Sequence, residues 1–109
     1  MSDTGFSPEV RAQIDGRSLG LCEVCGHGRV VEHHHRRPRG AGGSRRADTN
    51  TAANGLGCCR ECHRMIESHR AVALLMGWLV PQNSSPAVHS VVYRGERVFL
   101  TDGGQAVAA

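Results

Sequence analysis

The sequence predicts a single small α+β domain. The chain has 109 residues, the length of one domain, with only one Trp, one Tyr and two Phe among them. Segments with helical and with strand-like patterns alternate along it, and two Cys-x2-Cys pairs lie between them. A domain this small buries a modest fraction of its surface. We therefore expect metal bound by the cysteines to supplement the apolar core of one domain spanning residues 1–109.

The first half predicts a helix, a strand and a loop. Ser7 is a typical helix N-cap and Pro8 suits the first helical position, so a helix is expected from there to about Gly16. The β-branched centre of residues 29–33 indicates a strand. The polar, glycine-rich residues 36–53 predict a long loop, and loops of this length are often functional.

The second half predicts an extended segment, a long helix and a β-hairpin. The expected bounds are 54–58 for the extended segment, 62–76 for the helix, and 88–93 and 97–100 for the strands of a hairpin within residues 78–102. Gly77 is a natural C-cap for the helix. Residues 103–109 offer little that could pack, and we expect this tail to be disordered.

The cysteine pairs are Cys22-x2-Cys25 and Cys59-x2-Cys62. Two such turns can complete a tetrahedral site, so we expect a closed, structural Zn²⁺ site, with free thiols or a redox pair as the alternative. No signal-peptide pattern or long apolar run is present, which favours a reducing, cytoplasmic location without a membrane. Cys58 is one residue out of register and is expected to be a small buried apolar side chain.

Five of the basic residues form a cluster in the predicted loop. All 13 are Arg, the net charge is +3, and no acid lies between Glu32 and Asp48. A guanidinium grips phosphate in a bidentate manner, so the cluster favours a polyanionic partner, although a solvated loop is the alternative. The candidate nucleic-acid-binding residues are Arg36, Arg37, Arg39, Arg45 and Arg46.

An ordered set of His, Asn and Cys residues carries the strongest functional signal. The order is His33-His34-His35 with Pro38 three residues after His35, then Asn54 five residues before Cys59, then His63 directly after Cys62. This combination covers roughly residues 22–69. It resembles HNH endonucleases of the zinc-ribbon type, especially the small enzymes of phages and prophages.

The resemblance implies a ββα-metal core, or His-Me finger, with treble-clef-like zinc knuckles, which hydrolyses DNA phosphodiester bonds by nicking or double-strand cutting. It implies that His35 activates water and that Asn54 stabilises the loop and orients His35 through a hydrogen bond. It further implies that His34 and His63 hold a catalytic divalent ion, Mg²⁺ or another such as Mn²⁺ or Ni²⁺. Glu67 lies one helical turn after His63 and is a candidate third ligand, with an exposed carboxylate as the alternative.

The identity of the base within the histidine run and the function each allow an alternative. Pairing His33 with His34 would make His34 the base, although the spacing to Pro38 favours His34 with His35. A non-catalytic zinc-knuckle module that binds nucleic acid is the alternative function. The resemblance implies DNA as partner, a phage terminase and portal as further partners, the bacterial host cytoplasm as location if phage-encoded, and a monomer or weak dimer.

Overall fold

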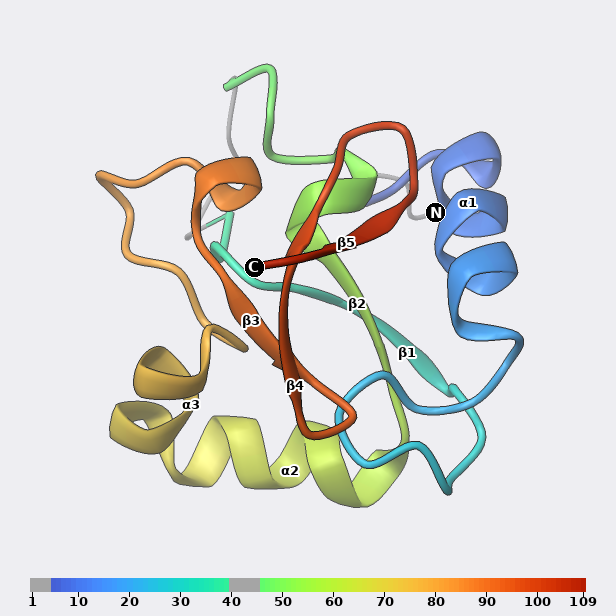
Figure 1. Cartoon of the computed structure of the whole chain (residues 1–109), viewed down its shortest axis with the longest axis vertical. Coiled ribbons are helices and arrows are strands. Elements are labelled where there is room, and N and C mark those ends of the chain that lie inside the picture. The colour runs from blue at the N-terminus through green and yellow to red at the C-terminus, as the bar shows by residue number, and fades with distance from the viewer. Residues whose placement is uncertain (1–4, 40–45) are drawn as a thin grey trace.

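The computed structural model describes residues 5–39 and 46–109, and its α+β architecture confirms the predicted class (Figure 1). In chain order the elements are α1 (Pro8–Ser18), β1 (Glu32–His35), a 3₁₀ turn (Ala52–Asn54), β2 (Gly55–Cys58), α2 (Arg60–Ser68), α3 (Arg70–Met76), a second 3₁₀ turn (Pro86–Val88), β3 (Val91–Tyr93), β4 (Glu96–Leu100) and β5 (Ala106–Ala108). Strands β1 and β2 form one sheet, and β3, β4 and β5 form the other. Within the described residues, no helix has the length and apolar character needed to span a membrane.

Helix α1 begins where the sequence predicts. The Ser7 side chain accepts a hydrogen bond from the Val10 amide at 3.1 Å. The helix nevertheless continues past Gly16 and ends at Ser18, with Leu19 in the left-handed conformation, so the predicted end was wrong. A glycine inside a helix costs only about 1 kcal/mol. Tertiary hydrogen bonds from the side chain of Arg17 in the last turn offset that cost.

The histidine run itself forms strand β1, which lies later than the strand expected at 29–33. The preceding residues are bonded elsewhere, because the Val30 amide donates to the Gly20 carbonyl and the Val31 amide to that of Cys58. β1 runs antiparallel to β2, with His34 opposite Leu56. This pairing presents the histidines at the boundary between the sheet and α2.

Strand β2 is buried along its whole length, and its glycines allow neighbours to approach closely. A Cβ atom on Gly55 would lie 2.3 Å from Ile14 of α1, and one on Gly57 would lie 2.9 Å from Val30. The extended segment expected at 54–58 is thus confirmed from Gly55 onward. Helix α1 packs against β2 where Ile14 meets Gly55.

The helix expected at 62–76 is two helices. Cys59 is the N-cap of α2, so that helix starts at Arg60, and the chain leaves helical geometry at His69 before α3. Gly77 ends α3 with a φ of 79°, as predicted. A side chain could not replace this glycine, because its Cβ would lie 2.1 Å from the Ser90 carbonyl oxygen.

The C-terminal hairpin is confirmed, although β3 starts at Val91 because residues 86–88 form a 3₁₀ turn. Arg94 and Gly95 both have positive φ, the geometry of a two-residue hairpin turn. The tail expected to be disordered instead forms β5, which pairs antiparallel with β4. Backbone bonding at the edge of β4 holds this segment, and Gly104 supplies the turn with a φ of 89°. The side-chain composition of residues 103–109 did not indicate that they would pair with another strand.

Candidate functional site

The four paired cysteines meet as predicted. Their sulfur atoms all lie within 4.8 Å of one another, in a group formed by Cys22, Cys25, Cys59 and Cys62. Four sulfurs at this separation are close enough to bind one metal ion. It is the single group of three or more candidate metal ligands found among residues 5–39 and 46–109.

The turns around the cysteines are shaped for sulfur ligands. Backbone amides donate to Sγ, from Val24 to Cys22 at 3.4 Å and from His27 to Cys25 at 3.4 Å. Burial raises the pKa of the Cys25 thiol, but bonds from the Gly28 and His27 backbone outweigh it and lower the pKa to about 6. We call the turn that carries Cys22 and Cys25 the first knuckle and the turn that carries Cys59 and Cys62 the second. A Cβ atom on Gly28 would lie 2.6 Å from that of Cys59, so only glycine lets the two knuckles approach each other this closely.

Cys58 stands apart from this group, as the sequence predicts. It lies in β2 with no solvent exposure and is absent from the four-sulfur cluster. Burial and the neighbouring acidic groups raise the pKa of its thiol. Cys58 is therefore a neutral core side chain.

A second group of candidate site residues lines an open cleft of about 400 Å³. Strand β1 supplies its three histidines, and His63 and Glu67 from α2 face them. The remaining lining residues are Glu32, Pro38, Arg39, Arg70 and Leu79. The structure thus brings together the predicted base, His35, and both predicted ligands of a catalytic ion, His34 and His63.

His34 is held as a neutral imidazole. It is 7% exposed, and its Nε2 donates to the Trp78 carbonyl at 2.9 Å, since a carbonyl oxygen can only accept. Burial lowers the pKa of His34 to about 4, and the charges of His63 and His35 act in the same direction. The His34 and His63 rings meet edge to face, with centroids 5.5 Å apart. Nδ1 of His34 is left with the lone pair that a metal ligand needs.

His35 is fixed by a ring stack and one hydrogen bond. Its ring stacks on Phe6 with centroids 4.0 Å apart, and its Nε2 donates to Oδ1 of Asn50 at 2.7 Å. Burial lowers the pKa of His35, while the bond to Asn50 opposes that shift. With the proton on Nε2, the lone pair resides on Nδ1, which can accept a proton from water.

Asn54 makes no hydrogen bond to His35, so its expected role in orienting the base was wrong, whereas its bonds agree with its other expected role, stabilising the loop. Its Oδ1 accepts from the Arg37 amide at 2.7 Å, and its Nδ2 donates to the Thr49 carbonyl at 2.7 Å. Asn54 thereby ties the two ends of the predicted loop, residues 36–53, to each other. The asparagine that orients His35 is Asn50, which sequence reasoning missed because no spacing rule singles it out.

Two histidines of the cleft contact acidic side chains. Nε2 of His33 lies 2.8 Å from Oδ1 of Asp15, which places the first histidine of the run against α1. Nε2 of His63 lies 3.7 Å from Oε2 of Glu67, one helical turn away. This contact between successive turns of α2 places the Glu67 carboxylate beside the His63 ring.

Two of the predicted phosphate-binding arginines are buried. Arg36 is 0% exposed and Arg37 is 1% exposed, so neither can meet a DNA backbone, and this prediction was wrong for both. Arg37 pairs with Asp48 and donates to the Ser84 carbonyl. Arg39 lines the histidine cleft, and Arg46 donates to the Gln82 carbonyl. Arg45 lies outside the described residues.

Arg36 joins four separate carbonyl oxygens. Its guanidinium donates to those of Gly77, Ala53 and His89 at 2.8 Å each, and to that of Pro86 at 3.2 Å. Burial lowers its pKa to about 10. Because Arg36 directly follows His35, this bracket fixes the end of the histidine strand.

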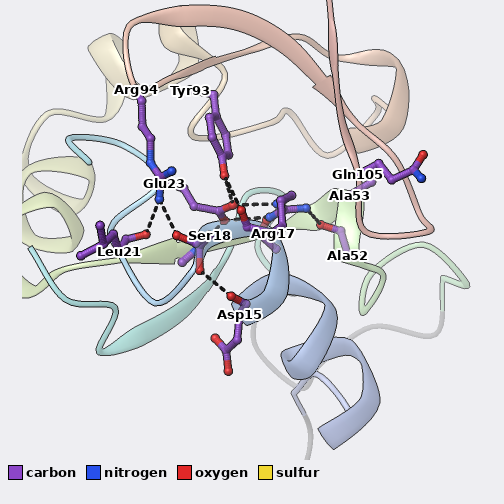
Figure 2. A network of polar contacts seen from close by, with 12 residues as sticks. Asp15, Arg17, Ser18, Leu21, Glu23, Ala52, Ala53, Tyr93, Arg94 and Gln105 are labelled. Carbon is purple, nitrogen blue, oxygen red and sulfur yellow. Dashed lines mark hydrogen bonds and ion pairs between the residues drawn. The ribbon is translucent and has the colours of Figure 1, made fainter. Parts of the chain in front are cut away.

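A second buried polar network, also missed from sequence, holds the first knuckle against the rest of the domain. Glu23 has no exposure and accepts from Arg17 at 2.7 and 2.8 Å, from the Tyr93 hydroxyl at 2.7 Å and from the Gly57 amide at 2.8 Å. Figure 2 shows the Tyr93 hydroxyl and the Arg17 guanidinium converging on this carboxylate. Burial raises the pKa of Tyr93 to about 12, helped by the charge of Glu23. No signal in the sequence distinguishes Glu23 from an exposed acid.

Comparison with known proteins does not assign the chain to a family. No family model matches it, and no curated protein or solved structure is significantly similar to it. A functional interpretation therefore depends on the two sites themselves.

Proposed function

We propose that the chain is a metal-dependent endonuclease of the HNH type that hydrolyses DNA phosphodiester bonds. One observation carries this proposal: His34, His35 and His63 line a single open cleft where an antiparallel strand pair meets the helix that follows it. This is the arrangement that a ββα-metal core requires. A purely structural zinc domain needs none of these three side chains.

In the proposed reaction His35 is the general base. Asn50 and Phe6 hold its ring so that Nδ1 is the nitrogen with the lone pair. Nδ1 takes a proton from a water molecule, the water oxygen attacks phosphorus, and the bond from phosphorus to the 3′ oxygen breaks, with that oxygen taking up a proton from solvent. The expected products carry a 5′ phosphate and a 3′ hydroxyl.

The side chains opposite His35 suit a divalent ion. His34 is kept neutral by burial, His63 lies against it, and the Glu67 carboxylate is one turn along α2. Two imidazoles beside an open cleft leave room for substrate oxygens. Glu67 would have to turn toward the ion to become a third ligand, because only the four cysteines already form a group of three or more ligand atoms among the described residues. An ion such as Mg²⁺, Mn²⁺ or Ni²⁺ bound there would stabilise the negative charge that develops on the phosphate and on the leaving oxygen.

The cysteine cluster has a separate task. We infer that it holds Zn²⁺, because four sulfurs on two knuckles match the ligand set of structural zinc. Four protein ligands close the coordination sphere, so this ion would stabilise the fold and take no part in hydrolysis. The first knuckle and the start of α2 would then be fixed to each other.

Nicking of supercoiled plasmid with added Mg²⁺, Mn²⁺ or Ni²⁺ tests the proposal. His35→Ala is expected to lower nicking by about 10²-fold or more, the usual contribution of a general base, while zinc content and circular dichroism stay unchanged. His33→Ala is the matched control, since it removes an imidazole from the same cleft, and it should retain activity. Loss of nicking in His33→Ala alone would show that the register is wrong. If the wild-type protein binds DNA but does not cut it with any of the three metals, that result contradicts the enzyme and favours a binding module.

A further inference from the structure

The described arginines divide into two classes. Seven of the twelve donate hydrogen bonds within the fold, and Arg39 has a further interaction. The guanidinium groups of the other four make no hydrogen bond or ion pair with another described residue, and all four side chains are exposed: Arg29, Arg60, Arg64 and Arg70. An unpaired guanidinium keeps all five donors for a ligand.

Three of these four arginines gather around His63. Arg70 lines the histidine cleft, whereas Arg60 and Arg64 line a neighbouring hollow of about 410 Å³. The two hollows share Glu32 and His63, so they form one groove that passes across His63. Unpaired arginines therefore stand on both sides of the proposed cutting position.

The spacing on α2 suits a polyanionic strand. Arg60 and Arg64 are four residues apart, so they project from the same face about 6 Å apart along the helix axis. The acids in the groove adjoin histidines, since Glu32 precedes His33 in β1 and Glu67 lies 3.7 Å from His63. Negative charge thus accompanies the histidines, where a cation would bind, and the unpaired arginines line the two hollows that meet at His63.

We propose that this groove, lined by Arg60 and Arg64 on one side of His63 and by Arg70 on the other, is the track that binds the DNA phosphate backbone. The choice of DNA as the polyanion rests on the proposed nuclease function. The track replaces the arginine cluster after the histidine run, whose first two members are buried. It contacts phosphates alone, so it supplies affinity and register without sequence preference.

The salt dependence of DNA binding tests this proposal. Binding of a fluorescein-labelled DNA duplex is measured by anisotropy without added divalent metal, from about 50 to about 200 mM salt, so that no cleavage occurs. Each phosphate contact contributes about one to the slope of log K against log salt concentration. The double variant Arg60→Gln/Arg64→Gln is expected to lower that slope by about two, and Arg70→Gln by about one.

The matched control is Arg29→Gln/Arg97→Gln. It also removes two exposed positive charges, but neither residue lines the groove, so the slope should stay at the wild-type value. An equal fall in both double variants would mean that binding follows net charge, and that result would overturn the track. An unchanged slope in Arg60→Gln/Arg64→Gln, or a wild-type protein that does not bind the duplex, would overturn it too.

The plasmid assay distinguishes a failure of the phosphate track from a failure of the proposed nuclease activity. If the wild-type protein nicks DNA while the α2 variants bind with an unchanged slope, the track is wrong and the enzyme stands. If it cuts no plasmid with any metal but the slopes differ as expected, the track stands and the enzyme is wrong.

Discussion

Replacing Arg36 with methionine tests whether this residue is part of the fold or of a DNA contact. The side chain joins carbonyl groups from the 3₁₀ turn before β2, from the end of α3 and from the segment leading into β3. Methionine keeps much of the aliphatic stem but removes every donor. The carbonyl oxygens of Gly77 and Ala53 would then be buried without that partner, while that of Pro86 would keep the bond from the His89 amide.

The expected loss of stability is large for a domain of this size. A buried acceptor left without a partner costs about 1–3 kcal/mol, so two of them cost about 2–6 kcal/mol. Removing a buried charge recovers part of this, because burial already disfavours the charged guanidinium, as its lowered pKa of about 10 indicates. We therefore expect a loss near the lower end, about 3 kcal/mol. The whole domain has only about 5–15 kcal/mol to lose.

Urea unfolding followed by tryptophan fluorescence measures this loss. Trp78 is the single tryptophan, is 9% exposed, and donates from Nε1 to the Val92 carbonyl at 2.7 Å, so it reports on the region that Arg36 holds. Arg64→Met is the control, because it removes an exposed arginine without a partner and should change stability by no more than about 0.5 kcal/mol. If Arg36→Met kept the wild-type unfolding free energy and lost DNA binding instead, the structural assignment of Arg36 would be refuted.

Four further outcomes are expected. Cys58→Ser should keep about one zinc per chain by elemental analysis, whereas Cys59→Ser should lose both zinc and fold. Glu23→Gln should cost about 3–5 kcal/mol in urea unfolding, because it leaves the guanidinium of Arg17 buried without its carboxylate; Glu61→Gln, at an exposed position, should cost little. Asn50→Ala should slow nicking by about 10²-fold at unchanged DNA affinity, since it frees the His35 ring to rotate; a change in affinity alone would contradict this. The pKa of His34 is about 4 in the fold against an ordinary 6.5, so the unfolded chain takes up this proton first as pH falls. Wild-type stability relative to His34→Gln should therefore decrease by about 3 kcal/mol between pH 6.5 and pH 4 and then level off, and a constant difference would contradict the shift.

The sequence could predict what depends on short spacing. Two thiols on one turn can be recognised from two intervening residues, and the cluster of four sulfurs confirms that reasoning. The approach of His34 to His63 could be anticipated only through the resemblance, because these residues lie far apart along the chain and meet through the pairing of β1 with β2. Local capping signals at Ser7 and Gly77 also held, since each depends on a few neighbouring atoms.

What the sequence could not predict is which charged residues are buried. Arg36 and Arg37 stand in a run that reads as a solvent-exposed basic loop, yet their partners lie up to 53 residues away. Glu23 likewise finds Gly57 and Tyr93 only after the knuckle, β2 and β3 have come together. Residue type alone cannot separate a buried arginine from an exposed one, because the distinction depends on carbonyl groups supplied by the tertiary fold.

These buried polar groups also explain how a chain with four aromatic side chains holds a cleft rigid. Arg36 fixes one end of β1 and Glu23 fixes the knuckle beside its other end, while the cysteine cluster ties that knuckle to the start of α2. No buried side-chain nitrogen or oxygen in the described residues lacks a hydrogen bond, so the networks around Arg36 and Glu23 are fully satisfied. Such networks stabilise one arrangement against others, because any shift would leave charged groups unpaired in the interior. His35 and His63 thus belong to elements that buried polar side chains and the cysteine cluster hold in place, while the cleft that they line stays open.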